Sequence, residues 1–124
     1  MTSDMQGVLA GRRVLVVEDQ YLVAEEMRRM VCSLGGEVLG PVARPAPALR
    51  ILAEQPVDLA VLDINLGPED AYPLAAELMR RQVPFLFTTG CEPWMDAEQF
   101  CRVPRVEKPL TAKTFADALR RAGM

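Results

Sequence analysis

The sequence predicts an α/β fold in which helices cover both faces of one five-stranded parallel sheet, a doubly wound arrangement. Short β-branched runs alternate with stretches whose apolar residues recur at helical spacing, and this alternation is typical of parallel sheets. The 124 residues, 50% of them hydrophobic and 25% charged, suit one domain with its own core. No linker, repeat or low-complexity segment divides the chain. We therefore expect a single domain over residues 1–124, with residues 1–11 as a flexible leader.

The first strand and the first helix have clear signals. Residues 13–17 (RVLVV) are a β-branched run that predicts a strand. Over residues 20–34 the apolar positions keep helical spacing, and Gly35-Gly36 supplies the stop of that helix. Residues 37–42 predict a weaker second strand.

The middle of the chain continues the alternation. Residues 45–54 predict a short helix, which Pro56 closes. Residues 58–62 (DLAVL) predict a buried third strand. Gly67-Pro68 opens a loop, and the apolar residues within 71–78 form the inward face of the next helix.

The last third of the chain contains one ambiguous segment. Residues 85–88 (FLFT) predict the fourth strand. Residues 91–102 have little apolar periodicity and Pro93 interrupts them, so we expect the fourth helix to be short or mobile. Residues 103–107 predict the fifth strand, and Thr111 can cap a final helix.

Composition excludes several classes of function. The chain has no histidine, which rules out Ser-His-Asp and Cys-His catalytic sites, imidazole-bearing zinc sites and phosphohistidine donors. A net charge of −3 with scattered arginine pairs indicates no nucleic-acid partner. The N-terminus resembles no signal peptide, and no apolar run is long enough to predict a membrane span. Three cysteines without C-x-x-C spacing are typical of reduced thiols, so we expect a cytoplasmic protein.

Polar residues follow the predicted strands at their carboxyl ends, where parallel sheets bind ligands. These residues are Glu18-Asp19, Asp63, Thr89-Gly90 and Lys108-Pro109. Each alone is more often a turn or cap residue, and Asp19 could cap the helix that follows it. Together they favour a binding site, because three clustered carboxylates are costly unless a cation neutralises them.

A hard divalent cation fits these oxygen ligands, and Mg²⁺ takes one or two carboxylates together with phosphate oxygens. The Lys108 ammonium and the Thr89 hydroxyl would then donate to a phosphoryl group. The set therefore predicts phosphoryl transfer by positioning and charge neutralisation. The nucleophile would be a carboxylate, and Asp63 is favoured because its strand is central in the chain order.

Four segments of the sequence carry a resemblance to a known family. They are VLVVEDQ (14–20), LAVLDINL (59–66), PFLFTTG (84–90) and VEKPL (106–110). They stand in the right order and each lies at a strand end. From Arg13 to Gly123 the chain resembles the receiver domain of two-component response regulators. The resemblance implies the flavodoxin-like receiver fold of five strand–helix units.

The resemblance also implies a role for each strand-end residue. Asp63 is similar to the phosphoacceptor of the family. The implied Mg²⁺ ligands are Glu18, Asp19, Asp63 and the main-chain carbonyl of Asn65. The implied phosphate-binding and switch residues are Thr89, Gly90 and Lys108, with a cis bond between Lys108 and Pro109. Asn65 and Cys91 hold positions that tune dephosphorylation in the family.

Two features distinguish this chain within the resemblance. Arg105 stands three positions before Lys108, where receivers commonly carry an aromatic switch residue. Either Arg105 simply faces solvent, or signalling uses ordering of residues 91–102 in place of the Thr–aromatic coupling. The run Phe87-Thr88-Thr89-Gly90 resembles a subgroup with a Phe-x-Thr-Gly signature, many of whose members are single-domain proteins.

These observations predict a stand-alone phosphoacceptor that takes a phosphoryl group from a kinase phosphohistidine onto Asp63 with Mg²⁺. The expected partners are a sensor histidine kinase or a histidine phosphotransfer protein, and a downstream protein target. No nucleic acid or membrane is expected. Because no output domain follows Met124, the output would be a protein–protein event or onward phosphotransfer.

Two alternatives remain open. A small phosphatase with an Asp nucleophile also needs Mg²⁺, Thr and Lys, but usually carries a second Asp where Asn65 stands here. A receiver-like interaction module that is never phosphorylated would be favoured by loss of a site residue, and none is lost. The phosphatase alternative lacks a cap domain to enclose a substrate, so we expect a signalling module that catalyses only its own phosphorylation and dephosphorylation.

Overall fold

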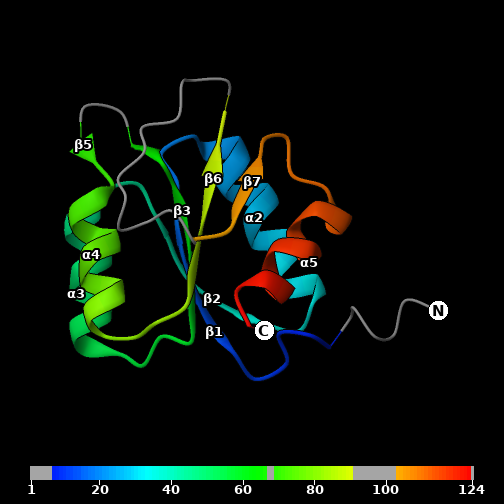
Figure 1. Ribbon diagram of the computed structural model, residues 1–124, viewed down its shortest axis with the longest axis horizontal. Coiled ribbons are helices and arrows are strands. Elements are labelled where there is room, and N and C mark those ends of the chain that lie inside the picture. The colour runs from blue at the N-terminus through cyan, green and yellow to red at the C-terminus, as the bar shows by residue number, and fades with distance from the viewer. Residues whose placement is uncertain (1–6, 67–68, 91–102, 124) are drawn as a thin grey trace.

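Five parallel strands form the central sheet, in the order β2-β1-β3-β6-β7 (Figure 1). The computed structural model describes residues 7–66, 69–90 and 103–123. The strands are β1 (Arg13–Val17), β2 (Glu37–Val42), β3 (Leu59–Asp63), β6 (Phe85–Thr89) and β7 (Arg105–Glu107). All four neighbouring pairs are parallel. The predicted five-stranded α/β fold is confirmed, and each strand lies within two residues of its predicted bounds.

Four helices in the described part of the chain cover the sheet on both faces. They are α2 (Tyr21–Ser33), α3 (Pro45–Glu54), α4 (Tyr72–Arg80) and α5 (Ala112–Arg121). Helices α2 and α5 lie on one face, and α3 and α4 lie on the other (Figure 1). The arrangement is therefore doubly wound, as predicted. The fourth helix predicted over residues 91–102 lies outside the described residues.

Alternate residues of the three interior strands, β1, β3 and β6, enter two separate cores, one on each face of the sheet. In β1, Leu15 and Val17 pack toward α3 and α4, while Val14 and Val16 pack toward α2 and α5. Both sets are fully buried. Burial on both faces explains why these interior strands are mostly apolar runs rather than alternating ones.

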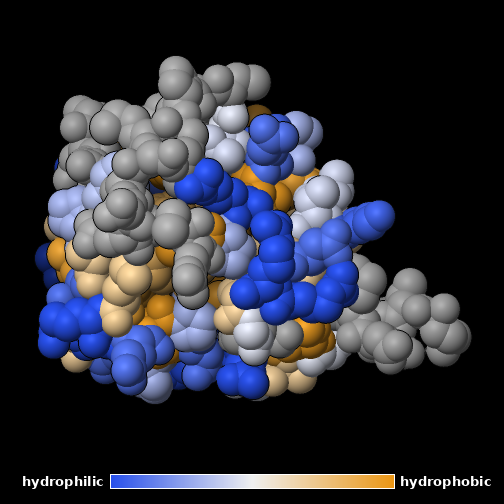
Figure 2. Space-filling model, viewed as in Figure 1, coloured by the Kyte–Doolittle hydropathy of each residue, from blue (hydrophilic) through white to orange (hydrophobic). Residues whose placement is uncertain are grey.

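Helix α5 shows how a local signal and an amphipathic pattern agree. The Thr111 hydroxyl accepts a hydrogen bond from the Thr114 N–H at 3.1 Å, which caps the helix as predicted. Phe115 and Leu119 are fully buried beneath it. Its outer side carries charged residues such as Lys113, and the surface over α5 is accordingly hydrophilic (Figure 2).

Three local features differ from the sequence-based expectations or add to them. The N-cap of α2 is Gln20, with no side-chain cap, so Asp19 does not cap the helix. An antiparallel pair of two-residue strands, β4 (Asn65–Leu66) and β5 (Glu69–Asp70), stands where a plain loop was expected. Strands this short show no alternation that a sequence could reveal. A cis bond precedes Pro41, and the expected cis bond precedes Pro109.

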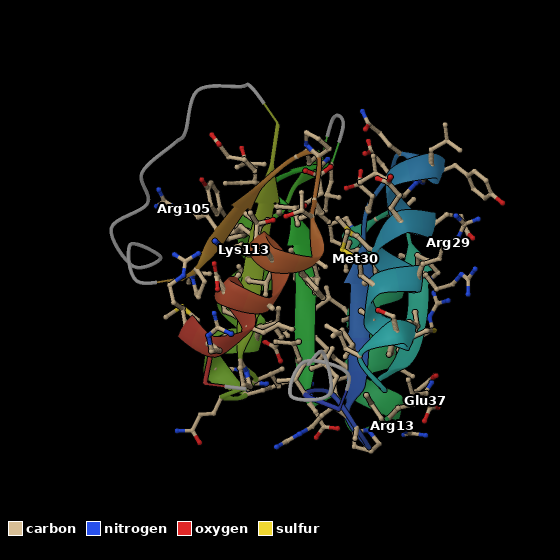
Figure 3. All side chains as sticks on the ribbon, turned by 90° about the vertical axis from the view of Figure 1, so that its right-hand side faces the viewer. Arg13, Arg29, Met30, Glu37, Arg105 and Lys113 are labelled. Atoms are coloured by element: carbon tan, nitrogen blue, oxygen red, sulfur yellow. The ribbon has the colours of Figure 1, made fainter. Side chains whose placement is uncertain are left out.

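Two residues in the described part of the expected leader, Val8 and Leu9, pack on the core. Leu9 is fully buried, and its N–H donates to the Leu34 carbonyl at 3.0 Å. At this end of the sheet Arg13 and Glu37 form an ion pair across β1 and β2, with 3.7 Å between nitrogen and oxygen (Figure 3). None of the helices in the described residues is long and apolar enough to cross a membrane.

Candidate functional site

Three carboxylates meet at the carboxyl ends of β1 and β3, which are neighbours in the sheet. Glu18 and Asp19 directly follow β1, and Asp63 is the last residue of β3. One ligand oxygen from each lies within 4.8 Å of the others. The winding of the chain reverses between β1 and β3, because β2 lies on one side of β1 and β3 on the other. Open α/β sheets bind ligands at such a switch point.

Two of the three carboxylates are buried. Glu18 is 3% exposed and Asp63 is 2% exposed, whereas Asp19 is exposed. Burial raises the pKa of Glu18 to about 7, and the charge of Asp63 adds to the rise. The Lys108 ammonium and a hydrogen bond from the Gln20 N–H (3.0 Å to Oε2) act in the opposite direction. The cluster therefore holds more negative charge than its surroundings readily stabilise.

Lys108 supplies the positive charge that the described structure places in this cluster. Its Nζ lies 3.0 Å from Glu18 Oε1 and 3.1 Å from Asp63 Oδ2. Burial lowers the pKa of Lys108, but the carboxylates of Glu18 and Asp63 outweigh it and the net shift is upward. The ammonium is therefore firmly protonated and bridges the two buried carboxylates.

The donor set fits a hard divalent cation such as Mg²⁺, which prefers carboxylate and carbonyl oxygens. Glu18 Oε1 is buried and has no hydrogen bond of good geometry among the described residues, although Lys108 Nζ forms an ion pair with it. Such an atom has coordination capacity left. Asn65, whose main-chain carbonyl was expected to complete the ligands, stands two residues after Asp63, at the start of β4. The residues present therefore match an oxygen-ligated metal site.

Thr89 and Gly90 reach the same end of the sheet on β6, the strand next to β3. Thr89 is partly buried, and its hydroxyl donates to the Gly90 carbonyl at 3.4 Å. The Thr89 carbonyl accepts the Lys108 N–H at 2.8 Å, which joins the ends of β6 and β7. The order β3-β6-β7 thus brings the hydroxyl and the ammonium to the carboxylates. Cys91 lies outside the described residues.

Arg105 lies apart from the carboxylates, at the start of the edge strand β7 (Figure 3). Strands rise about 3.3 Å per residue, so three residues separate it from Lys108 by about 10 Å along the strand. Arg105 is partly buried, and the expectation that it faces solvent stays a prediction. Its carbonyl accepts a hydrogen bond from the Arg121 guanidinium at 3.3 Å. The alternative, ordering of residues 91–102, stays a prediction because that segment lies outside the described residues.

No pattern in the sequence points to one further residue at this site. The Val42 carbonyl, at the end of β2, accepts the N–H of Glu18 at 2.9 Å. Val42 contributes through its main chain, and main-chain contacts leave no residue-type signal. Only the register of β1 against β2 reveals this contact.

The metal-free protein is expected to lose stability as the pH rises from about 4.5 to about 7. The pKa of Glu18 is about 7 in the folded state and 4.5 ordinarily, so the folded state binds this proton more tightly. The resulting stabilisation is fully present below pH 4.5 and is lost as the pH rises through 7. Urea unfolding at several pH values measures this dependence.

The same chain offers clean controls for this pH dependence. It has no histidine, so no imidazole titrates in this range. Arg80 and Arg81 lower the pKa of Glu77 to about 2. The contribution of Glu77 to the free energy of unfolding is therefore lost only as the pH falls below 4.5, outside the range in which Glu18 titrates. Glu18→Gln should flatten the profile. A flat profile in the unmodified protein, or an unchanged one in this variant, would contradict the assignment.

Comparisons with known proteins agree with this arrangement. A family model described as "Response regulator receiver domain" matches residues 14–120. The positive alginate biosynthesis regulatory protein of Pseudomonas aeruginosa is 32% identical over an alignment of 114 residues, and the match covers 88% of this chain and 46% of that protein. The chain thus spans less than half the length of this curated relative.

Solved structures give the same result. The solution structure of SdrG from Sphingomonas melonis Fr1 has a TM-score of 0.83 and 32% identity, and the match covers 91% of this chain and 97% of that one. The BeF3-activated conformation of SdrG from Pseudomonas melonis Fr1 has a TM-score of 0.77 and 34% identity, over 90% and 96% of the two chains. The Phe-x-Thr-Gly subgroup stays a prediction.

Proposed function

The chain belongs to the response regulator receiver domain family, and from this premise we propose that it accepts a phosphoryl group on Asp63 in a Mg²⁺-dependent reaction. Receiver domains are signalling modules of response regulators. One observation carries the finer proposal. The buried carboxylate of Asp63 lies among two further carboxylates and one ammonium, at the switch point of the sheet.

The proposed reaction is an in-line displacement at phosphorus. An Asp63 carboxylate oxygen attacks the phosphorus of a phosphohistidine as the P–N bond breaks, and the electron pair of that bond leaves on the imidazole nitrogen. The product is an aspartyl phosphate. Mg²⁺ would be held by Glu18, Asp19, Asp63 and the Asn65 carbonyl, and it would neutralise charge on the phosphoryl oxygens. Hydrolysis of the acyl phosphate returns the free carboxylate.

The residues of β6 and β7 would stabilise the transferred group. Lys108 already bridges Asp63 and Glu18, so its ammonium lies within reach of a phosphoryl oxygen on Asp63. Thr89 lies at the end of the strand that pairs with β3, and its hydroxyl can turn from the Gly90 carbonyl toward the same group. Both would donate hydrogen bonds to developing negative charge. We also propose that Gly90 forms part of the turn that binds the phosphoryl group, and that Cys91 influences the rate of dephosphorylation.

This chain has no histidine, so a phosphohistidine donor would lie outside it. A sensor histidine kinase or a histidine phosphotransfer protein in the cytoplasm fits that requirement. The output would be a changed affinity for a downstream protein, through a shift between two populated conformations. The BeF3-activated conformation recorded for SdrG supports a switch of this kind.

Incubation with acetyl phosphate and Mg²⁺, followed by intact mass spectrometry, tests the proposal. We expect a mass gain of one phosphoryl group, lost when EDTA removes the metal. Loss of the mass gain in base and its survival in mild acid would be typical of an acyl phosphate. If no mass gain occurs at any Mg²⁺ concentration, the unphosphorylated interaction module becomes the better explanation.

Lys108→Met is expected to slow phosphorylation by acetyl phosphate about 10²–10³-fold, the usual effect of removing one donor to a developing oxyanion. The Mg²⁺ affinity of this variant should not fall. Without the Lys108 ammonium, the negative charge of Glu18 and Asp63 is no longer neutralised and remains available to the metal. Initial rates from intact mass and Mg²⁺ titration calorimetry measure the two effects. The chain has one other lysine, Lys113, which is exposed on α5 (Figure 3). Lys113→Met should leave both quantities unchanged, and an equal rate loss in the two variants would exclude a specific role for Lys108.

A further inference from the structure

Strand β2 carries one residue more than β1 just before the carboxylate cluster. Leu15 pairs with Leu39, whereas Val17 pairs with Val42. Two steps along β1 therefore correspond to three along β2, which is a β-bulge at Gly40 and Pro41. Bulges of this kind are frequent beside functional sites, where they re-aim the residues that follow.

The bulge determines which carbonyl accepts the hydrogen bond from the Glu18 N–H. Past the extra residue, the Val42 carbonyl accepts the Glu18 N–H at 2.9 Å. An unshifted register would instead pair Val17 with Pro41, and a proline has no N–H to offer the ladder. The bulge therefore extends the pairing of β1 and β2 as far as the first metal-ligand candidate.

Glu18 is then held at three points. Its N–H is bonded to Val42, its Oε2 accepts the Gln20 N–H at 3.0 Å, and its Oε1 lies 3.0 Å from Lys108 Nζ. Its side chain is fully buried. The contacts to Gln20 and Lys108 act on the carboxylate, whereas the bond to Val42 fixes the main chain that carries it. A displacement of Val42 would therefore displace the buried carboxylate as well.

Gly40 permits this bulge for two independent reasons. Its φ of +94° lies in the left-handed region, which favours glycine. A Cβ at this position would lie 2.8 Å from the Val42 nitrogen and 3.1 Å from the Val16 carbonyl oxygen. Both neighbours are main-chain atoms, which cannot turn aside as a side chain can. Any other L-residue must push apart the two strands immediately before Glu18.

We propose that the Gly40 bulge is a positioning device that sets the Glu18 carboxylate for metal binding, through the Val42 carbonyl. The inference rests on the proposed function only in taking Mg²⁺ as the ion. Mg²⁺ demands near-ideal octahedral geometry with ligands at about 2.0–2.1 Å, so shifts of a few tenths of an ångström matter. Residues that orient a ligand without touching the metal typically affect affinity about 10–100-fold.

Gly40→Ala is expected to weaken Mg²⁺ binding by that factor of about 10–100, measured by titration calorimetry without any phosphoryl donor. Gly11→Ala is the matched control. Gly11 also has a positive φ, +75°, but nothing lies within 4 Å of the Cβ it would acquire. Both variants introduce left-handed strain and should lose stability, but only Gly40→Ala should lose affinity. Equal Mg²⁺ affinities in the two folded variants would overturn the proposal.

Amide hydrogen exchange in the unmodified protein gives a second test that does not need the variant to fold. If the Glu18–Val42 bond and metal binding are coupled, the coupling is reciprocal, so Mg²⁺ should slow exchange of the Glu18 amide. The Glu37 amide is the internal control, because it donates to the Arg12 carbonyl at 2.8 Å at the far end of the same strand pair. Equal slowing of both amides, or of neither, would overturn the proposal.

The outcomes separate this inference from the proposed function. Loss of Mg²⁺ affinity in Gly40→Ala with no phosphorylation of the unmodified protein would leave the positioning role standing and remove phosphoryl transfer. Phosphorylation of the unmodified protein with equal Mg²⁺ affinity in Gly40→Ala and Gly11→Ala would support phosphoryl transfer and remove the positioning role of Gly40.

Discussion

Asp63→Asn is expected to abolish acceptance of a phosphoryl group. The amide of asparagine has no anionic oxygen to attack phosphorus, and the variant also removes one of the three clustered carboxylates. Glu18 and Lys108 keep their ion pair at 3.0 Å, so the fold around the site should persist. Intact mass after incubation with acetyl phosphate and Mg²⁺ should show no phosphoryl adduct, where the unmodified protein shows one.

Asp58→Asn is the matched control, since Asp58 immediately precedes β3 and Asp63 ends it. The Oδ2 atom of Asp58 accepts a hydrogen bond from the Arg13 N–H at 2.8 Å, at the end of the sheet opposite to Asp63. This variant should lose some stability and still accept the phosphoryl group. A phosphoryl adduct on Asp63→Asn, or its absence on a folded Asp58→Asn, would place the acceptor elsewhere.

Asp63→Asn should also change the titration of Glu18. The charge of Asp63 contributes to raising the pKa of Glu18, after burial as the larger cause. Without that charge the pKa should fall from about 7 toward its ordinary value. The loss of stability between about pH 4.5 and pH 7 should therefore become smaller in this variant. This links the functional variant to a readout that needs no phosphoryl donor.

Phe87→Ala is expected to cost about 3–5 kcal/mol of unfolding free energy, the usual range for a fully buried aromatic residue. Phe87 is fully buried in β6. Its ring makes edge-to-face contacts with Tyr72 and Phe85, at centroid distances of 6.2 and 5.6 Å. Against a typical total stability of about 5–15 kcal/mol, this loss brings the domain close to unfolding.

Urea unfolding measures this loss as a shift of the midpoint with little change in slope. Leu49→Ala is a suitable control, because Leu49 is 38% exposed on α3 and its truncation should change stability by about 0.5 kcal/mol or less. A loss of about 1 kcal/mol or less in Phe87→Ala would mean that the core closes around the missing ring, contrary to its tight packing.

Local residue patterns were enough to predict the five strands of the central sheet, the helices in the described residues and the chemical types of the residues at the strand ends. The run RVLVV in β1 and the Thr111 cap of α5 are local signals, read from side chains a few residues apart. The sequence also indicated the family, since the four motifs stand in order along the chain. The roles of Asp63 and its neighbours follow from that resemblance and stay predictions.

How those residues meet depends on the order of the strands in the folded sheet. The order β2-β1-β3-β6-β7 makes Asp63 a neighbour of Glu18 on one side and brings Lys108 from the other. The pKa of Glu18 near 7 and the bond from its N–H to Val42 both arise from contacts between strands distant in sequence. Burial, register and main-chain hydrogen bonds depend on which segments become neighbours, and no local pattern of residue types records that.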